Sequence, residues 1–139
     1  MFLGENRHTI DEKGRLTIPA KYRGLLAAGV VVTRGIDRNL IAFSMEGWDE
    51  LAARVKSLPW SDPSTREFRR RVFSGAVDLV PDRQGRILLP PYLREFANLG
   101  TEVVIAGVHD HLEIWNDEAW ELVREAAESD ELHWENLGI

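Results

Sequence analysis

The motif Asp-x-x-Gly-Arg occurs twice in this sequence, at residues 11–15 and again at residues 82–86. Glycine beside a charged or amide residue, between apolar segments, is typical of a β-hairpin turn. The aspartates can accept backbone hydrogen bonds in the turn, and the arginines can pair with a carboxylate across or between the copies. We therefore expect a structural role for four residues of the turns: Asp11, Gly14, Asp82 and Gly85.

Further basic side chains accompany both motifs. Lys13 and Arg15 belong to the first motif, Arg83 and Arg86 to the second, with Arg7, Lys21, Arg23 and Arg94 near them in the sequence. Two hairpins related by a twofold axis would form one basic surface, which attracts phosphates and whose arginines can read guanine edges in the major groove. Judged by charge alone, a solvated or self-paired surface is the stronger interpretation, and DNA binding is the alternative.

The overall charge argues at first against a nucleic-acid partner. The chain has 139 residues with 17 Lys and Arg against 23 Asp and Glu, a formal net charge of −6. The charge is uneven, however. Residues 66–94 carry seven arginines against three acids, whereas residues 110–139 carry one arginine against ten acids. The acidity is thus mainly a property of the C-terminal segment, and both motifs lie in locally basic stretches.

The two motifs belong to a longer internal repeat. Residues 11–19 match residues 82–90 at an offset of 71, and from Thr101 onward an offset of 72 continues the match as far as Trp48 and Trp120. Two copies predict an α+β unit with pseudo-twofold symmetry, whose halves complete each other's core. We expect one domain over residues 5–48 and a second over residues 76–120. A helical connection over 49–75 would join them, and a C-terminal helix with an acidic tail would occupy 121–139.

Each copy has the same expected elements. Strands are predicted at residues 5–10 and 76–81, at the motif arms, at the β-branched segments near residues 30 and 103, and after the turns at 37–39 and 109–111. Ser44 and Asn116 are predicted N-caps of the helices that close the copies. Pro63, in the first turn, marks the start of the connecting helix. The tail from residue 128 is expected to be frayed or weakly helical.

Several other patterns predict no catalysis. The sequence has no cysteine, which excludes a thiolate zinc site and a cysteine nucleophile. His109 and His111 are interpreted as a polar turn rather than metal ligands, and no nucleotide-binding or nucleophile motif is present. No apolar run approaches the roughly 20 residues of a membrane helix. We therefore expect that the protein is not an enzyme and that it binds no cofactor, metal, membrane or small-molecule substrate. Arg69–Arg71 are expected to pair with the acidic C-terminal helix of the same or a neighbouring subunit.

The sequence opens with Met-Phe-Leu-Gly, carries the doubled motif, has Lys21-Tyr22-Arg23 shortly after Pro19, and has a tryptophan in both closing helices, Trp48 and Trp120. In these features the chain resembles the MraZ family of bacterial transcriptional regulators. The likeness extends to about residue 127. It implies a tandem AbrB-like swapped-hairpin β-barrel flanked by short helices. It also implies a cytoplasmic, nucleoid-associated repressor of the division and cell-wall gene cluster, which binds repeated promoter boxes as a ring-shaped homo-oligomer.

The resemblance places the family's motif residues on Asp11 and Arg15, and again on Asp82 and Arg86. The basic residue inside the first motif is Lys13, whereas the second copy has Gln84 there, with Arg83 beside it. The resemblance therefore implies a DNA contact less strongly for the second hairpin than for the first. A second hypothesis keeps the fold: AbrB-like hairpins also occur in antitoxins whose disordered tail neutralises a toxin. The acidic tail favours that hypothesis, and the duplicated, folded chain argues against it.

Overall fold

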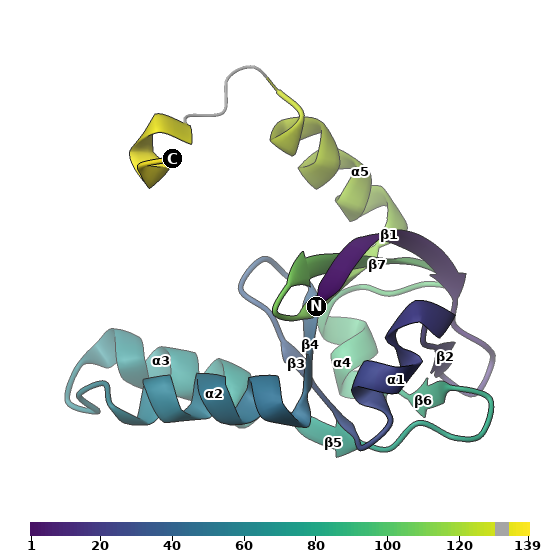
Figure 1. The fold of residues 1–139 in the computed structure, drawn as a ribbon, viewed down its shortest axis with the longest axis horizontal. Coiled ribbons are helices and arrows are strands. Elements are labelled where there is room, and N and C mark those ends of the chain that lie inside the picture. Colours follow the sequence, from purple (N-terminus) through teal and green to yellow (C-terminus); the bar gives the residue numbers. More distant parts are fainter. Residues whose placement is uncertain (130–133) are drawn as a thin grey trace.

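The computed structural model describes residues 1–129 and 134–139 and has a mixed α+β fold built around antiparallel strands (Figure 1). Part of the predicted acidic tail, residues 130–133, lies outside the described residues. The elements are β1 (Phe2–Thr9), β2 (Arg15–Thr17), η1 (Ala20–Tyr22), α1 (Arg23–Leu26), β3 (Val30–Arg34), β4 (Leu40–Ser44), α2 (Met45–Lys56), α3 (Pro63–Val72), β5 (Val77–Leu79), β6 (Arg86–Leu88), α4 (Pro91–Phe96), β7 (Glu102–His109), β8 (Leu112–Asn116), α5 (Asp117–Ala127) and η2 (Trp134–Leu137).

The main sheet mixes strands from both sequence copies. Its six strands follow the order β1-β7-β8-β4-β3-β5, and every pairing is antiparallel. The first strand of each copy pairs with a strand of the other: β1 pairs with all eight residues of β7, and β5 pairs with three residues of β3. Neither copy therefore completes its own sheet.

The motif arms form a separate two-stranded ribbon of β2 and β6. In this ribbon Leu16 lies opposite Ile87, the residue 71 positions later in the chain. The β4–β8 pair likewise places Ile41 opposite Glu113, which are 72 positions apart. Positions that correspond in the repeat thus face each other at both places, as a twofold relation between the copies would require.

The core lies between the main sheet, the ribbon and the short helices α1 and α4. Leu26, Val30, Leu89 and Leu93 are fully buried there. The valine run of β3 is buried on both faces, which suits a strand with neighbours on either side and helices against it. The ribbon contributes through Leu16 and Ile87, whose side chains point inward.

The helix boundaries follow the capping residues. Ser44 accepts a hydrogen bond from the Gly47 amide, and Asn116 accepts one from the Ala119 amide, so both predicted N-caps are confirmed. The connecting helix α3 starts as expected with Pro63 at its first position, and the preceding residue, Asp62, caps it.

Several strand boundaries differ from the expectation. β1 starts at Phe2 rather than residue 5, because β7 supplies a partner along its whole length. β7 reaches His109 for the same reason. β5 is short, with only three residues, since β3 offers it only Val30–Val32.

Two helical parts project from the body. α2 and α3 form a helical hairpin on the side of the molecule away from the ribbon, with Trp48 of α2 against Phe73 at the end of α3, and α5 leaves the sheet on another side (Figure 1). None of the residues of α5 is buried. In the described part of the chain, no helix has the length and apolar character needed to cross a lipid bilayer.

Candidate nucleic-acid interface

The loop of each motif is organised by its aspartate. Asp11 Oδ1 accepts the backbone N–H groups of Lys13 (3.0 Å) and Arg15 (2.9 Å). The Gly14 amide donates to the Asp11 carbonyl at 2.9 Å, and Gly14 has a φ of +86°, which glycine adopts without strain. Asp82 makes the corresponding hydrogen bonds in the second loop. Both aspartates therefore accept backbone hydrogen bonds within their own turns.

Each motif arginine pairs with the aspartate of its own loop. Arg15 Nε lies 2.6 Å from Asp11 Oδ2, and Arg86 Nε lies 2.8 Å from Asp82 Oδ2. The motif arginines thus pair across their own turns and not with a carboxylate of the other copy, because the loop already places a carboxylate beside the arginine four residues later. These pairs use only Nε, so they leave the two terminal nitrogens of each guanidinium to other partners.

The same contacts keep the aspartates ionised. The backbone N–H of Arg15 is the main cause that lowers the pKa of Asp11 below its usual value, with the Arg15 guanidinium and the Lys13 amide adding to it. In the second loop the Arg86 amide is the main cause of the lowered pKa of Asp82. Each loop therefore holds its arginine in a fixed orientation at neutral pH.

The ribbon presents one outward face. Since Leu16 and Ile87 point into the core, the alternation of a strand turns their neighbours outward. Arg15 then lies opposite Leu88, and Thr17 lies opposite Arg86. Leu88 is 55% exposed, and the side chains of Arg15 and Arg86 are 33% and 29% exposed. Two oriented guanidinium groups therefore share the outer face of a narrow β-ribbon.

Sequence reasoning did not single out Thr17 and Leu88 on this face. They carry no charge and lie within a repeat that otherwise suggested a structural strand. The alternation of apolar residues around Leu16 and Ile87 was the signal that could have identified them, because it fixes which side chains share a face.

Two further arginines link the hairpins to each other. Arg23 donates through Nε to the Ile18 carbonyl at 3.1 Å and packs over Gly85 of the other copy. Arg94 donates through Nε to the Leu89 carbonyl at 3.1 Å and packs over Gly14.

Backbone hydrogen bonds add to this link. The Ile18 amide donates to the Gly85 carbonyl at 2.8 Å, and the Leu89 amide donates to the Gly14 carbonyl at 2.9 Å. The two loops are therefore held by opposite copies, one at each end of the ribbon.

The remaining predicted residues lie at different distances from the ribbon face. Lys13 lines a hollow of about 430 Å³ beside Leu88 and Arg94, next to that face. Arg83 is exposed in the second loop. Lys21 instead lies against the Tyr22 ring, with its Nζ 5.1 Å from the ring centroid, and beside β1.

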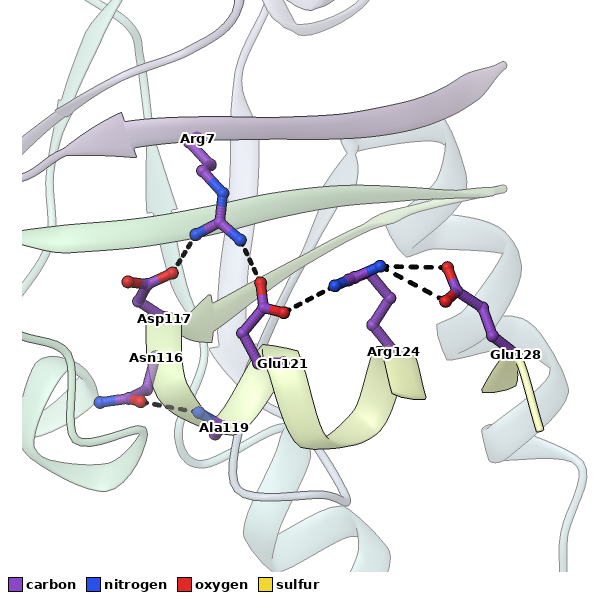
Figure 2. Close-up of polar contacts among 7 residues, drawn as sticks. All are labelled: Arg7, Asn116, Asp117, Ala119, Glu121, Arg124 and Glu128. Atoms are coloured by element: carbon purple, nitrogen blue, oxygen red, sulfur yellow. Dashed lines mark hydrogen bonds and ion pairs between the residues drawn. The ribbon is translucent and has the colours of Figure 1, made fainter. Parts of the chain in front are cut away.

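Arg7 is directed to α5 rather than to the ribbon (Figure 2). Its guanidinium donates to Asp117 and to Glu121, and the ion pairs continue from Glu121 to Arg124 and from Arg124 to Glu128. The hydrogen bond to Asp117 is the main cause that raises the pKa of Arg7. This chain of charges fixes the start of α5 on β1.

The structure places Arg69–Arg71 away from the acidic helix. The acids of α5 that form ion pairs do so with Arg7 and Arg124, and none of the described residues of the C-terminal segment pairs with Arg69–Arg71. The expected pairing within one chain is therefore not found in the described residues, because α5 and α3 lie on different parts of the molecule.

The histidine turn has the predicted form. His109 has a φ of +83°, and the Val108 amide donates to the His111 carbonyl across the turn. The His111 ring stacks on Phe43 with the centroids 4.9 Å apart. The interpretation as a polar hairpin turn is confirmed.

Known proteins resemble this chain over nearly its whole length. A family model described as "MraZ protein, putative antitoxin-like" matches residues 1–71 and again residues 72–135. A protein of Roseiflexus castenholzii named transcriptional regulator MraZ is 54% identical over 129 residues, which cover 93% of this chain and 90% of that protein.

More distant relatives carry the same name. One from Thermomicrobium roseum is 52% identical over 86% of this chain and 84% of its own length, and one from Acetivibrio thermocellus is 45% identical over 87% and 85%. The family model covers both motif-bearing hairpins, and the relatives align across both copies. From this agreement it follows that the chain belongs to the MraZ family.

Proposed function

We propose that this protein is a DNA-binding transcriptional repressor that contacts DNA through the outer face of the β2–β6 ribbon. The observation that carries the proposal is the pair of guanidinium groups that the ribbon holds outward, each fixed by its own aspartate. The major groove of B-DNA admits a two-stranded β-ribbon, and arginine is the side chain that most often reads guanine there. The relatives named transcriptional regulators support the same function.

The residues divide into two roles in this proposal. Arg15 and Arg86 reach base edges, because their orientation is fixed and their terminal nitrogens are not used by the aspartates. Lys13 and Arg83, on the loops at the two ends of the ribbon, contact phosphates and position the ribbon. The second loop has Gln84 where the first has Lys13, so we expect the first hairpin to contribute more binding energy.

Lys21 and Arg23 have supporting roles. Arg23 holds the Gly85 loop, and its charge adds to the field at the ribbon. Lys21 adds positive charge at the margin of the proposed DNA interface. Arg7, whose guanidinium is committed to α5, is not part of the proposed interface.

The fold supports a finer architecture. We infer two swapped-hairpin domains of the SpoVT-AbrB type, at residues 5–48 and 76–120, with a helical connection at 49–75 and a C-terminal segment at 121–139. The exchange of β1 and β5 between the copies supports this inference. Together the two domains would close into one barrel with the ribbon on the pseudo-twofold axis.

The resemblance also supports a biological setting. We propose that the protein acts in the cytoplasm on the nucleoid, at the head of the division and cell-wall gene cluster. There it would bind repeated promoter boxes as a ring-shaped homo-oligomer. One ribbon per subunit binds weakly, and several ribbons on correctly spaced boxes raise the overall affinity without new contacts. The function needs no catalytic group.

Footprinting on the DNA upstream of the protein's own gene tests this proposal. We expect protected boxes at regular spacing, and absence of protection at physiological salt would refute it. Arg15→Ala should weaken binding about 5- to 150-fold, equivalent to about 1–3 kcal/mol for a base contact. If Arg15 also neutralises a phosphate, the slope of log affinity against log salt falls by about 0.9.

Arg54→Ala on α2 is the matched control. It removes the same charge from an exposed position of α2, which lies on the side of the molecule away from the ribbon (Figure 1). The DNA affinity and salt slope of this variant should equal those of the wild type. An equal loss in Arg15→Ala and Arg54→Ala would show that only net charge matters.

A second candidate function is that of an antitoxin that neutralises a protein toxin. The antitoxin-like description of the family model and the acidic C-terminal segment favour it. Purification of the chain from its native host distinguishes the two functions. A small protein that co-purifies in a fixed ratio would support the antitoxin, and a homogeneous assembly of this chain alone would support the regulator.

A further inference from the structure

The hairpin of α2 and α3 carries an arginine-lined hollow that the proposed DNA interface does not use. It has a volume of about 640 Å³ and lies between α3 and the loop after β3. Seven residues line it: Arg34, Ile36, Ser64, Glu67, Phe68, Arg70 and Arg71. We call this site the arginine hollow.

Two arginines of the hollow are held in place by contacts, and its three arginines outnumber its one carboxylate, Glu67. Arg34 donates to the Arg70 and Arg71 carbonyls at the end of α3, and the Arg71 guanidinium lies 5.7 Å from the Phe96 ring centroid. Arg38 lies over the same ring at 4.9 Å. None of these guanidinium groups forms an ion pair with a carboxylate among residues 1–129 and 134–139. Cations clustered in this way favour an anionic partner.

The hollow also has an apolar wall. Ile36, which is 59% exposed, and Phe68 both line it. A partner that suits it therefore carries both carboxylates and an apolar side chain, rather than phosphate alone.

α5 has such a face on its solvent side. Glu118, Leu122 and Glu125 are spaced four and three residues apart, so they lie on one face of the helix. Leu122 is 71% exposed. The two glutamates are about 10.5 Å apart along the axis, and neither forms an ion pair with any residue in the described ranges. The acids that hold α5 to β1 are different ones, Asp117 and Glu121, and Figure 2 shows both directed toward Arg7.

The two surfaces cannot meet within one chain. Arg7 fixes the start of α5 on β1, at one edge of the sheet, whereas the hollow lies beside β3. α5 begins directly after β8 and packs on β7 and β8, whereas α3 packs on β3. Figure 1 shows α5 and the α2–α3 hairpin extending from different sides of the body.

We propose that the arginine hollow of one copy binds the Glu118–Leu122–Glu125 face of α5 from a second copy. Leu122 packs against Ile36 and Phe68, and the two glutamates pair with the hollow's arginines. Because the two surfaces differ, this contact is head-to-tail, and it leaves a free hollow and a free α5 at the ends of any open chain of subunits. Such a contact repeats until a ring closes. The inference rests on the proposed assembly of several copies and names the surfaces that join them.

Charge reversal tests this contact by measuring mass in solution without DNA. Wild type should sediment as a multiple of the 15.8 kDa chain. Arg70→Glu and Glu125→Arg should each shift the species toward 15.8 kDa. Arg70 and Glu125 are exposed and have no intrachain ion pair in the described structure, so the melting temperature measured by circular dichroism should stay near that of the wild type.

Mixing the two variants gives the decisive result. In an equal mixture, the reversed hollow of Arg70→Glu faces the reversed helix of Glu125→Arg, and the two unchanged surfaces face each other. We therefore expect the mixture to recover the wild-type mass. Glu50→Arg on α2 makes the same charge change as Glu125→Arg but lies outside both surfaces, so this variant should assemble like the wild type.

Three results would overturn the proposal. They are a monomeric wild type, unchanged mass in both single variants, and failure of the mixture to reassemble. Unchanged mass combined with weaker DNA binding by Arg70→Glu would assign the hollow to DNA phosphates instead. Failure of the proposed DNA function would appear separately, as an assembled protein that protects no promoter DNA.

Discussion

Replacement of Gly85 by alanine should destabilise the protein more than the same replacement of Gly14. Both glycines have positive φ, +75° and +86°, where an L-residue costs about 1–2 kcal/mol. At Gly85 a Cβ would also lie 2.5 Å from Arg23 Nε, so Arg23 must move and lose its hydrogen bond to the Ile18 carbonyl, about 1 kcal/mol. At Gly14 the nearest atom, Arg94 Cζ, is 3.0 Å away and needs only a small shift.

These values set the expected melting temperatures. Gly85→Ala should lose about 2–3 kcal/mol and Gly14→Ala about 1–2 kcal/mol. For a chain of this size, 1 kcal/mol corresponds to about 3–5 °C, so the two variants should melt roughly 6–15 °C and 3–10 °C below the wild type. Differential scanning calorimetry on both proteins, in one buffer, measures the difference directly.

Asparagine variants separate the two contributions, because asparagine tolerates positive φ better than alanine does. Gly14→Asn should recover most of the loss, whereas Gly85→Asn should retain the part that comes from displacing Arg23. Equal losses in the two alanine variants would refute the argument about Arg23. If neither alanine variant is destabilised, positive φ at these two positions has no cost for alanine.

Three further predictions follow from contacts elsewhere in the fold. Asp11→Asn should flatten the acid dependence of stability: the pKa of Asp11 is lowered by folding, so its stabilisation is present above its usual pKa and disappears as pH falls through the folded value. Urea midpoints of the wild type and of Asp11→Asn at neutral and acid pH check this. An equal fall of the midpoint with pH in both proteins would contradict it. Gly107→Ala should melt far below Gly100→Ala, because a Cβ at Gly107 would lie 2.5 Å from the Leu3 backbone nitrogen, whereas Gly100 has open space. Leu16→Ala, at a site only 1% exposed, should lower the free energy of unfolding by about 2–5 kcal/mol in urea titrations, and a loss below 1 kcal/mol would show that the ribbon is not packed on the core.

Local features of this chain were predictable from its sequence. The caps at Ser44 and Asn116, the turn that contains Gly14 and the aspartate hydrogen bonds in that turn depend on residues within four positions of each other. Such short-range chemistry requires no knowledge of the rest of the fold. The locally basic character of both motifs was equally visible.

The longer-range features were not predictable in the same way. Arg7 lies near the first motif in the sequence, yet its partners are Asp117 and Glu121, more than a hundred residues away. Only the pairing of β1 with β7 brings them together, and nothing local specifies that register. The outward position of Leu88 likewise depends on which face of the ribbon meets the core.

The exchange of first strands also sets the order in which the protein can fold on the ribosome. β1 is the first strand to be synthesised, but its partner β7 ends at His109, about a hundred residues later. At about 5–20 residues per second, β1 waits for roughly 5–20 s with its hydrogen-bonding edges unpaired. Its alternating exposed residues include Glu5 and Arg7, and charged side chains on an unpaired strand discourage contact with other nascent chains. The side chain that later anchors α5 therefore also protects the strand during this delay.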